Sequence, residues 1–194
     1  MKRLIALTVL FVSVFSAIAA DLDKGLEAAQ KGDYATALKE WQPLAEQGDA
    51  KAQHNLGFMY SRGDGVTKDD NTAVKWWSLA AKQGLPEAQY DLGYMYAHGR
   101  GVVQDPKVAV QWYINAAKQG YAKAQYNLGV QYFNGKGVSQ SYMRAYVWIN
   151  VAALQGHKKA TKSLKVVANK LTSTQINNAQ QIARDCISKN FKGC

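Results

Sequence analysis

The chain has 194 residues, of which 47% are hydrophobic and 20% charged, with only 3 prolines. This length fits one domain, and this composition excludes a chain that is disordered as a whole. The formal net charge of +10 favours contact with anionic surfaces.

Residues 1–19 have the pattern of a secretory signal peptide. Lys2 and Arg3 give a positive start, an apolar run follows, and Ala17 and Ala19 are small residues at the positions that a signal peptidase reads. A membrane anchor is the alternative, but the apolar run is shorter than the roughly 20 residues that span a bilayer. We therefore expect cleavage after Ala19 and a periplasmic or secreted mature protein.

Three segments of 36 residues follow one another without a gap, at 49–84, 85–120 and 121–156. Equivalent glycines and tryptophans recur at this period: Gly57, Gly93 and Gly129, then Trp76, Trp112 and Trp148. Segment 20–48 precedes them, and its part 32–48 matches the second half of a repeat. Because a single repeat cannot bury its apolar face alone, such units stack, and their ends need caps. We expect 20–48 to be an N-terminal cap with a degenerate half repeat.

Each repeat predicts two helices. In the first repeat, Ala52, Leu56 and Tyr60 mark one helical face, and Ala73, Trp76 and Ala80 mark another. A Gly-x-Gly-Val loop joins the two helices, and glycine there suits a helix end. Predicted N-caps of the second helices are Asp69, Asp105 and Ser141. The glycine inside each first helix predicts close approach of a large Trp or Tyr from the second helix.

Segment 157–194 does not repeat and predicts a C-terminal helical cap. Its helices are expected at 158–170 and 172–188, and Thr172 with Gln175 forms a capping-box pattern. The segment carries eight basic residues and one acid, a net charge of +7. The basic patch that we predict here consists of Lys158, Lys159, Lys162, Lys165 and Lys170. Two interpretations stay open: a salt-sensitive contact with an anionic envelope surface, or a solvated face that aids solubility.

Cys186 and Cys194 lie eight residues apart at the end of the chain. In an exported protein this spacing favours one structural disulfide that ties the last helix to the tail. Two free thiols are the alternative. No CxxC motif is present, so a redox function is not indicated.

The repeats resemble the Sel-one-like repeat family, a branch of the tetratricopeptide superfamily. Its Leu-Gly-x-x-Tyr element occurs three times, at 56–60, 92–96 and 128–132. Ser141 departs from the family's Asp, and the in-repeat cysteine pairs of the penicillin-binding branch are missing. The resemblance implies an all-α, right-handed α/α solenoid of helix-turn-helix repeats between helical caps. It also implies a role in protein–protein interaction.

Some positions of the first helices vary between repeats yet share one helical face. They are Lys51, Asn55, Phe58 and Arg62; Glu87, Asp91, Tyr94 and His98; Lys123, Asn127, Val130 and Asn134. In solenoids of the related family the first helices line the concave surface, so we expect a partner to bind this stripe. Aromatic and Arg side chains are typical anchors, which favours Phe58, Arg62, Tyr94 and His98. The alternative is that the stripe is merely solvated.

No catalytic or metal motif stands out. His54 occupies the position of Tyr90 and Tyr126, which indicates a packing variant, and His98 lies at a variable position. We expect no cofactor, no metal, no enzyme activity and no nucleic-acid partner, and we expect a monomer. The predicted function is an adaptor or scaffold in envelope function or host interaction. Alternatives are an immunity protein against an envelope-directed toxin and, less favoured, an enzyme acting on β-lactams or peptidoglycan.

Overall fold

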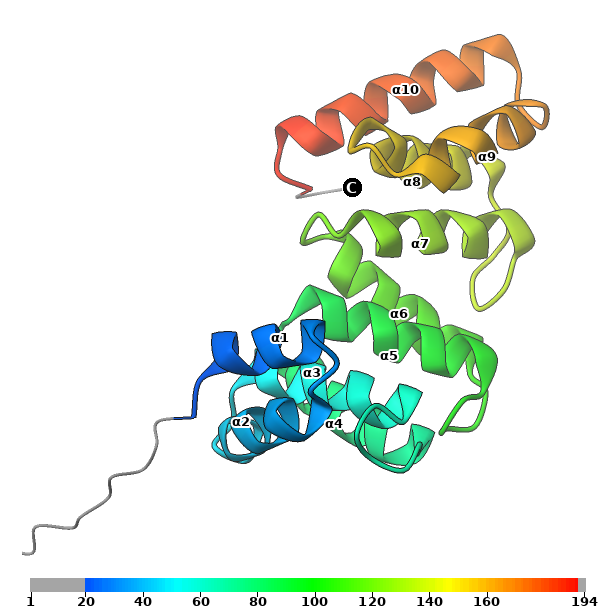
Figure 1. The fold of residues 1–194 in the computed structure, drawn as a ribbon. Coiled ribbons are helices and arrows are strands. Elements are labelled where there is room, and N and C mark those ends of the chain that lie inside the picture. The colour runs from blue at the N-terminus through cyan, green and yellow to red at the C-terminus, as the bar shows by residue number, and fades with distance from the viewer. Residues whose placement is uncertain (1–19, 192–194) are drawn as a thin grey trace, which may run out of the picture.

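The computed structural model describes residues 20–191. Ten helices and no strand occur in this range, which confirms the predicted all-α solenoid. Figure 1 shows α1 to α4 in the lower part of the molecule and α8 to α10 in the upper part, with α10 at the top. The helices are α1 (Leu22–Gln30), α2 (Tyr34–Glu46), α3 (Ala50–Arg62), α4 (Asp70–Lys82), α5 (Pro86–His98), α6 (Pro106–Ala117), α7 (Ala122–Asn134), α8 (Tyr142–Leu154), α9 (Lys158–Ala168) and α10 (Ser173–Ser188).

Two predictions fall on residues outside 20–191. The signal peptide occupies 1–19, and Cys194, the predicted partner of Cys186, lies beyond the described range. Cys186 itself is buried near the end of α10. Both the cleavage and the disulfide therefore stay predictions. Among residues 20–191, no helix is long and apolar enough to cross a bilayer.

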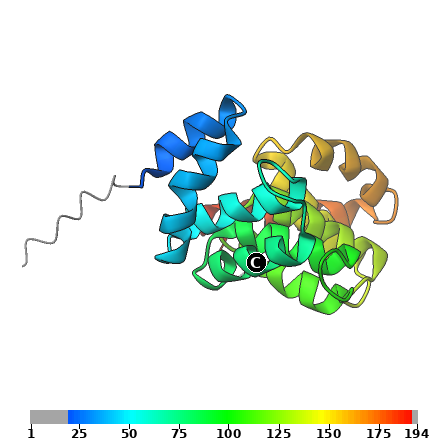
Figure 2. The same ribbon diagram turned by 60° about the horizontal axis from the view of Figure 1, so that its bottom comes forward.

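The repeats form three helix pairs, α3 with α4, α5 with α6, and α7 with α8, and each pair packs on the next. Figure 2 shows the α1–α2 pair at the N-terminal end of this stack. The predicted N-caps are confirmed, because the side chains of Asp69, Asp105 and Ser141 accept hydrogen bonds from backbone N–H groups of the following turn. Gly63, Gly99 and Gly135 end the first helices in the left-handed conformation.

The glycine inside each first helix makes room for one large side chain of the second helix. A Cβ on Gly93 would lie 2.8 Å from Cε1 of Tyr113. The indole of Trp77 covers Gly57 in the same way, as predicted, whereas in the third repeat the covering side chain is Ile149. Close approach of the helices therefore offsets the cost of glycine in a helix.

The second glycine of each loop has a different purpose. Gly101, with φ of 63°, lies against the backbone of Asp70 at the start of α4 in the preceding repeat, and a Cβ would overlap the Asp70 carbonyl. Gly137 lies in the same way on Pro106 at the start of α6. Arg100 adds a fork of hydrogen bonds to Asp70, at 3.0 and 3.2 Å. These loops therefore connect the two helices of a repeat and also pack on the start of the second helix of the preceding repeat.

The N-terminal cap is more complete than the half repeat predicted from sequence. Gly25 in α1 receives the indole of Trp41, and Trp41 Nε1 donates to the Leu22 carbonyl at 3.1 Å. Trp77 makes the same bond to the His54 carbonyl, also at 3.1 Å. The sequence pattern does not identify α1 as the first helix of a repeat-like pair, because α1 and α2 are joined by a short turn that lacks the Gly-x-Gly-Val loop.

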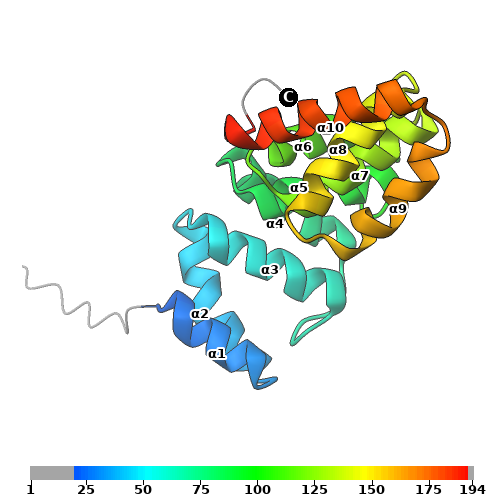
Figure 3. The same cartoon turned by 90° about the horizontal axis from the view of Figure 1, so that it is seen from above.

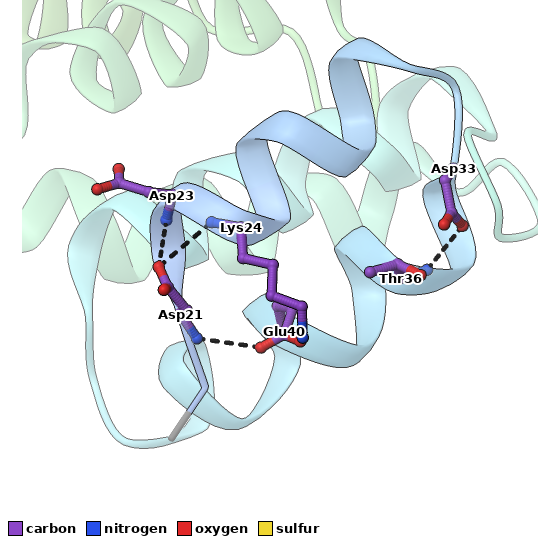
Figure 4. Close-up of polar contacts among 6 residues, drawn as sticks. All are labelled: Asp21, Asp23, Lys24, Asp33, Thr36 and Glu40. Atoms are coloured by element: carbon purple, nitrogen blue, oxygen red, sulfur yellow. Dashed lines mark hydrogen bonds and ion pairs between the residues drawn. The ribbon is translucent and has the colours of Figure 1, made fainter. Parts of the chain in front are cut away.

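Charged contacts hold this first pair together. Glu40 is 3% exposed and forms an ion pair with Lys24 of α1. Figure 4 shows Glu40 also accepting a hydrogen bond from the backbone N–H of Asp21, at 3.1 Å. The Asp21 side chain caps α1, and Asp33 caps α2 through the N–H of Thr36. Because Glu40 is buried, losing Lys24 would leave a charge without its partner.

The C-terminal cap covers α8. Both α9 and α10 pack on this helix, and Figure 3 shows α10 running beside it. All residues from 145 to 152 are buried, which is typical of a helix enclosed by neighbours on every side. The capping box of Thr172 and Gln175 is confirmed, and α9 ends at Ala168, slightly before the predicted 170.

Candidate protein-binding face

The variable stripe lies on α3, α5 and α7, and we call the surface that α1, α3, α5, α7 and α9 share the first-helix face. In each repeat, the outer members of the stripe are mostly exposed and the inner members half-buried. The exposed members are Lys51, Arg62, His98, Lys123 and Asn134. The half-buried members are Asn55, Phe58, Glu87, Asp91, Tyr94, Asn127 and Val130. Inner members therefore pack between helices and also reach the surface.

One contact recurs between neighbouring first helices, at a spacing of 37 residues. His54 Nε2 lies 2.8 Å from Asp91 Oδ2, and Tyr126 Oη lies 3.4 Å from Ser163 Oγ. Burial raises the pKa of Tyr90, and the side chain of Asn127, close to the Tyr90 hydroxyl, opposes that rise. The spacing is one repeat plus one residue, so each first helix touches the next through the same pair of positions. These contacts join α3, α5, α7 and α9 into one layer.

His54 and Asp91 form a polar pair whose side chains are largely buried, 13% and 15% exposed. Burial raises the pKa of Asp91, and the hydrogen bond from His54 opposes that rise. The sequence comparison interpreted His54 as a packing variant. Its ring does pack on Phe58, with centroids 4.8 Å apart, but it also makes this polar contact.

Phe58 and Arg62 form one anchor on α3. The Phe58 ring meets Trp77 edge to face at 5.5 Å, which fixes one side of the ring. The Arg62 guanidinium lies 5.6 Å from the Phe58 centroid, a cation–π distance. Asn55, Phe58 and Arg62 line a pocket of about 220 Å³ between α1, α2 and α3.

Tyr94 and His98 form a second anchor on α5. Their rings stack at 4.0 Å, and His98 Nδ1 lies 2.9 Å from the Tyr94 carbonyl. The two rings thus hold each other in place on α5. The structure therefore brings the four predicted anchors together in two pairs rather than one cluster.

Val130 belongs to an apolar pocket of about 160 Å³ between α7 and α9, with Phe133 and Val166 among its lining residues. Another pocket, of about 260 Å³, lies between α1, α3 and α5 and includes Lys51 and Glu87. Oε2 of Glu87 is a buried atom without a hydrogen-bond partner. The first-helix face therefore carries several separate pockets of different polarity.

The basic patch divides into two parts. All five of its lysines are exposed. Lys158 and Lys159 line a pocket with residues of α5 and α7, whereas Lys162, Lys165 and Lys170 do not line it. The sequence does not reveal this pocket, because the position shared by His54, Tyr90 and Tyr126 indicates packing rather than a surface site.

Among residues 20–191, no group of three or more His, Cys, Asp or Glu side chains is arranged to hold a metal ion.

Comparisons with known proteins agree with the repeat pattern. The family model described as the Sel1 repeat matches residues 50–85, 86–121 and 122–157. A comparison with curated proteins returned no significant match.

Two solved structures are similar. A protective antigen with an SLR fold from uropathogenic Escherichia coli strains is 28% identical, with a TM-score of 0.76 over 88% of this chain and 42% of that one. A Sel1 repeat protein from Oxalobacter formigenes is 43% identical, with a TM-score of 0.61 over 66% of this chain and 97% of that one. The chain thus spans less than half of the antigen's length.

Proposed function

Because the chain belongs to the Sel1 repeat family, we propose that it is an exported scaffold that binds a protein partner through its first-helix face. The observation that carries the proposal is the pairing of half-buried rings with exposed cationic or aromatic partners on that face. Phe58 with Arg62, and Tyr94 with His98, are rigid surface groups of the kind that supply most of the energy at protein interfaces. Pockets beside them give a partner side chains a place to insert.

Capture of proteins from envelope extract with the mature chain tests whether the first-helix face binds a protein partner. The test variant replaces the exposed anchors, R62A with H98A, and a second variant adds Phe58→Ala and Tyr94→Ala. The matched control replaces exposed residues of the second helices, Lys75, Gln111 and Asn115, by alanine. We expect the test variants to lose the partner and the control to keep it. Equal capture by all three, with equal thermal stability, would contradict the proposal.

Export belongs to the same proposal. It is supported by the sequence pattern of residues 1–19 and by the start of α1 at Leu22, close after the predicted cleavage site. The mass and N-terminal sequence of the protein recovered from the periplasm test it, and we expect a chain that begins at Ala20. A full-length cytoplasmic chain would contradict it.

If the captured partner is a hydrolase held in a tight one-to-one complex and inhibited, the immunity role replaces the adaptor role.

A further inference from the structure

A pocket of about 300 Å³ opens between α5, α7 and α9 on the first-helix face. It is lined by Tyr90, Lys123, Tyr126, Asn127, His157, Lys158 and Lys159. Each of the three helices contributes to it, so it exists only because the repeat and the C-terminal cap are stacked. Lys123 and Asn127 belong to the variable stripe, and Lys158 and Lys159 belong to the basic patch.

Ring contacts hold the base of this pocket. Tyr126 stacks on His157 at 4.9 Å with an interplanar angle of 27°. The Tyr126 hydroxyl reaches Ser163 of α9 at 3.4 Å, and Tyr90 packs on Tyr121 at 5.4 Å. His157 also caps α9, because its Nδ1 accepts the N–H of Ala160 at 3.1 Å. The pocket is therefore a built surface that needs little ordering on binding.

Three ammonium groups surround this base without a carboxylate among the lining residues. Lys123, Lys158 and Lys159 are exposed, and the ion pairs of residues 20–191 involve none of them. The pKa of His157 is lowered, first by burial and then by the nearby charges of Lys159 and Lys123. Lys158 and Lys159 also stand in the first turn of α9, where the helix macrodipole disfavours cations. The arrangement concentrates positive charge at a cost to helix stability.

We propose that this pocket binds the carboxylate side chains of an acidic segment in the protein partner, an inference that rests on the proposed function. A recessed site with an aromatic base accepts an extended chain, whose carboxylates meet the lysines while its backbone and methylene groups cover the rings. A lipid surface is flat and would instead contact the outer lysines, Lys162 and Lys165, at least as closely. The recess and the division of the basic patch favour the peptide.

The probe is a fluorescein-labelled peptide of alternating Glu and Gly, with a Gln and Gly peptide as its neutral counterpart. We expect the full mature chain to bind the Glu peptide and to release it as salt is added. K123Q/K158Q/K159Q should weaken binding by about tenfold, since each exposed pair contributes up to about 1 kcal/mol. The matched control K162Q/K165Q/K170Q removes the same charge outside the pocket and should weaken binding by less than about threefold.

A second readout is the pKa of His157, followed by NMR of its ring protons. Saturating Glu peptide should raise this pKa, because a bound carboxylate offsets Lys123 and Lys159. Equal weakening by the two triple variants, or an unchanged pKa at saturation, overturns the proposal. Binding to phosphatidylglycerol vesicles without binding to the Glu peptide overturns it as well.

The two proposals fail separately. If R62A/H98A keeps the envelope partner while the Glu peptide still binds the pocket, the scaffold proposal fails at the anchors and the pocket stands. If the anchors are needed but the two triple variants behave alike, the pocket assignment fails and the scaffold stands.

Discussion

The side-chain amide of Gln119 donates a hydrogen bond to Oε1 of Gln89 in the same repeat, at 2.8 Å, and another to the Gly84 carbonyl at the end of the preceding repeat, at 2.9 Å. Gln89 is buried and donates to the Ala81 carbonyl at 3.2 Å, in the repeat before it. The same arrangement recurs with Gln53 and Gln83, and with Gln125 and Gln155. Each junction between repeats is therefore closed by a polar joint as well as by apolar packing. Because adjacent units share these bonds, we expect them to unfold together rather than one by one.

Replacing Gln89 by Leu tests this joint. The change keeps the size of the side chain but removes two hydrogen bonds of Gln89, to the Ala81 carbonyl and from the Gln119 amide, each of which keeps a second partner. We expect the free energy of unfolding to fall by about 1–3 kcal/mol, since each lost hydrogen bond contributes about 0.5–1.5 kcal/mol. Urea unfolding followed by circular dichroism measures it. Q111L, at an exposed position of α6, is the control, and an equal loss there would contradict the role of the joint.

Gly93→Ala tests the close approach of α5 and α6. The added Cβ would meet the Tyr113 ring at 2.8 Å, and this ring is among the largest fully buried side chains. We expect a loss of about 1–3 kcal/mol in the free energy of unfolding, as for other overpacked cores. The double variant G93A/Y113L should lose less than the sum of the two single changes, because the smaller side chain leaves room for the Cβ. Additive losses would show that Tyr113 is not the obstacle.

Much of the fold could be predicted because the same helix, cap and loop patterns recur in three repeats. The caps at Asp69, Asp105 and Ser141, and the left-handed glycines that end the first helices, follow from local chemistry alone. The first half of the N-terminal pair could not be predicted, because its recognition depends on Gly25 meeting Trp41 across a turn of different length. The 36-residue period alone does not reveal a helix pair whose connecting loop has a different length.

The candidate site was harder to predict. The position shared by His54, Tyr90 and Tyr126 predicts packing, and this is incomplete, because Tyr90 and Tyr126 are half-buried and line a pocket. The contact of His54 with Asp91 needs the register between repeats, a spacing of 37, which only the stacked structure supplies. The one signal in the sequence is that both positions differ from their equivalents in the other repeats. His54 stands in place of a Tyr, and Asp91 stands in place of an Asn.

Thr172→Ala tests the start of the C-terminal cap. The Thr172 hydroxyl accepts the Gln175 N–H at 3.3 Å, and the Gln175 side chain accepts the Thr172 N–H at 2.8 Å. Losing the cap should lower the free energy of unfolding by about 1 kcal/mol. T174A, in the first turn of the same helix, keeps both bonds and serves as the control. Thermal unfolding of the two variants, followed at 222 nm, measures the difference, and equal midpoints would contradict a role for the cap.

The pH dependence of folding tests the buried pair of His54 and Asp91. Burial raises the pKa of Asp91 above its ordinary 3.8, while His54 and Lys123 act to lower it and Glu87 to raise it. A raised pKa means that the folded state holds the proton to higher pH than the unfolded state does. The stability associated with protonated Asp91 is therefore complete below 3.8 and is lost as pH rises through the folded pKa. We expect the stability of wild type minus that of D91N to fall as pH rises above 3.8, then to level off.

Asp69 is the control for the direction of this pH dependence, because its pKa is lowered, chiefly by the hydrogen bond from Thr72. For D69N the difference from wild type should be greatest above 3.8 and should shrink as pH falls through the lowered pKa. H54F should move the Asp91 window to higher pH, because it removes the hydrogen bond that opposes burial. Urea unfolding at pH 3, 5 and 7 compares the four chains. A difference for D91N that grows with pH would contradict a raised pKa, and it would then show that the attraction of His54 outweighs the cost of burying Asp91.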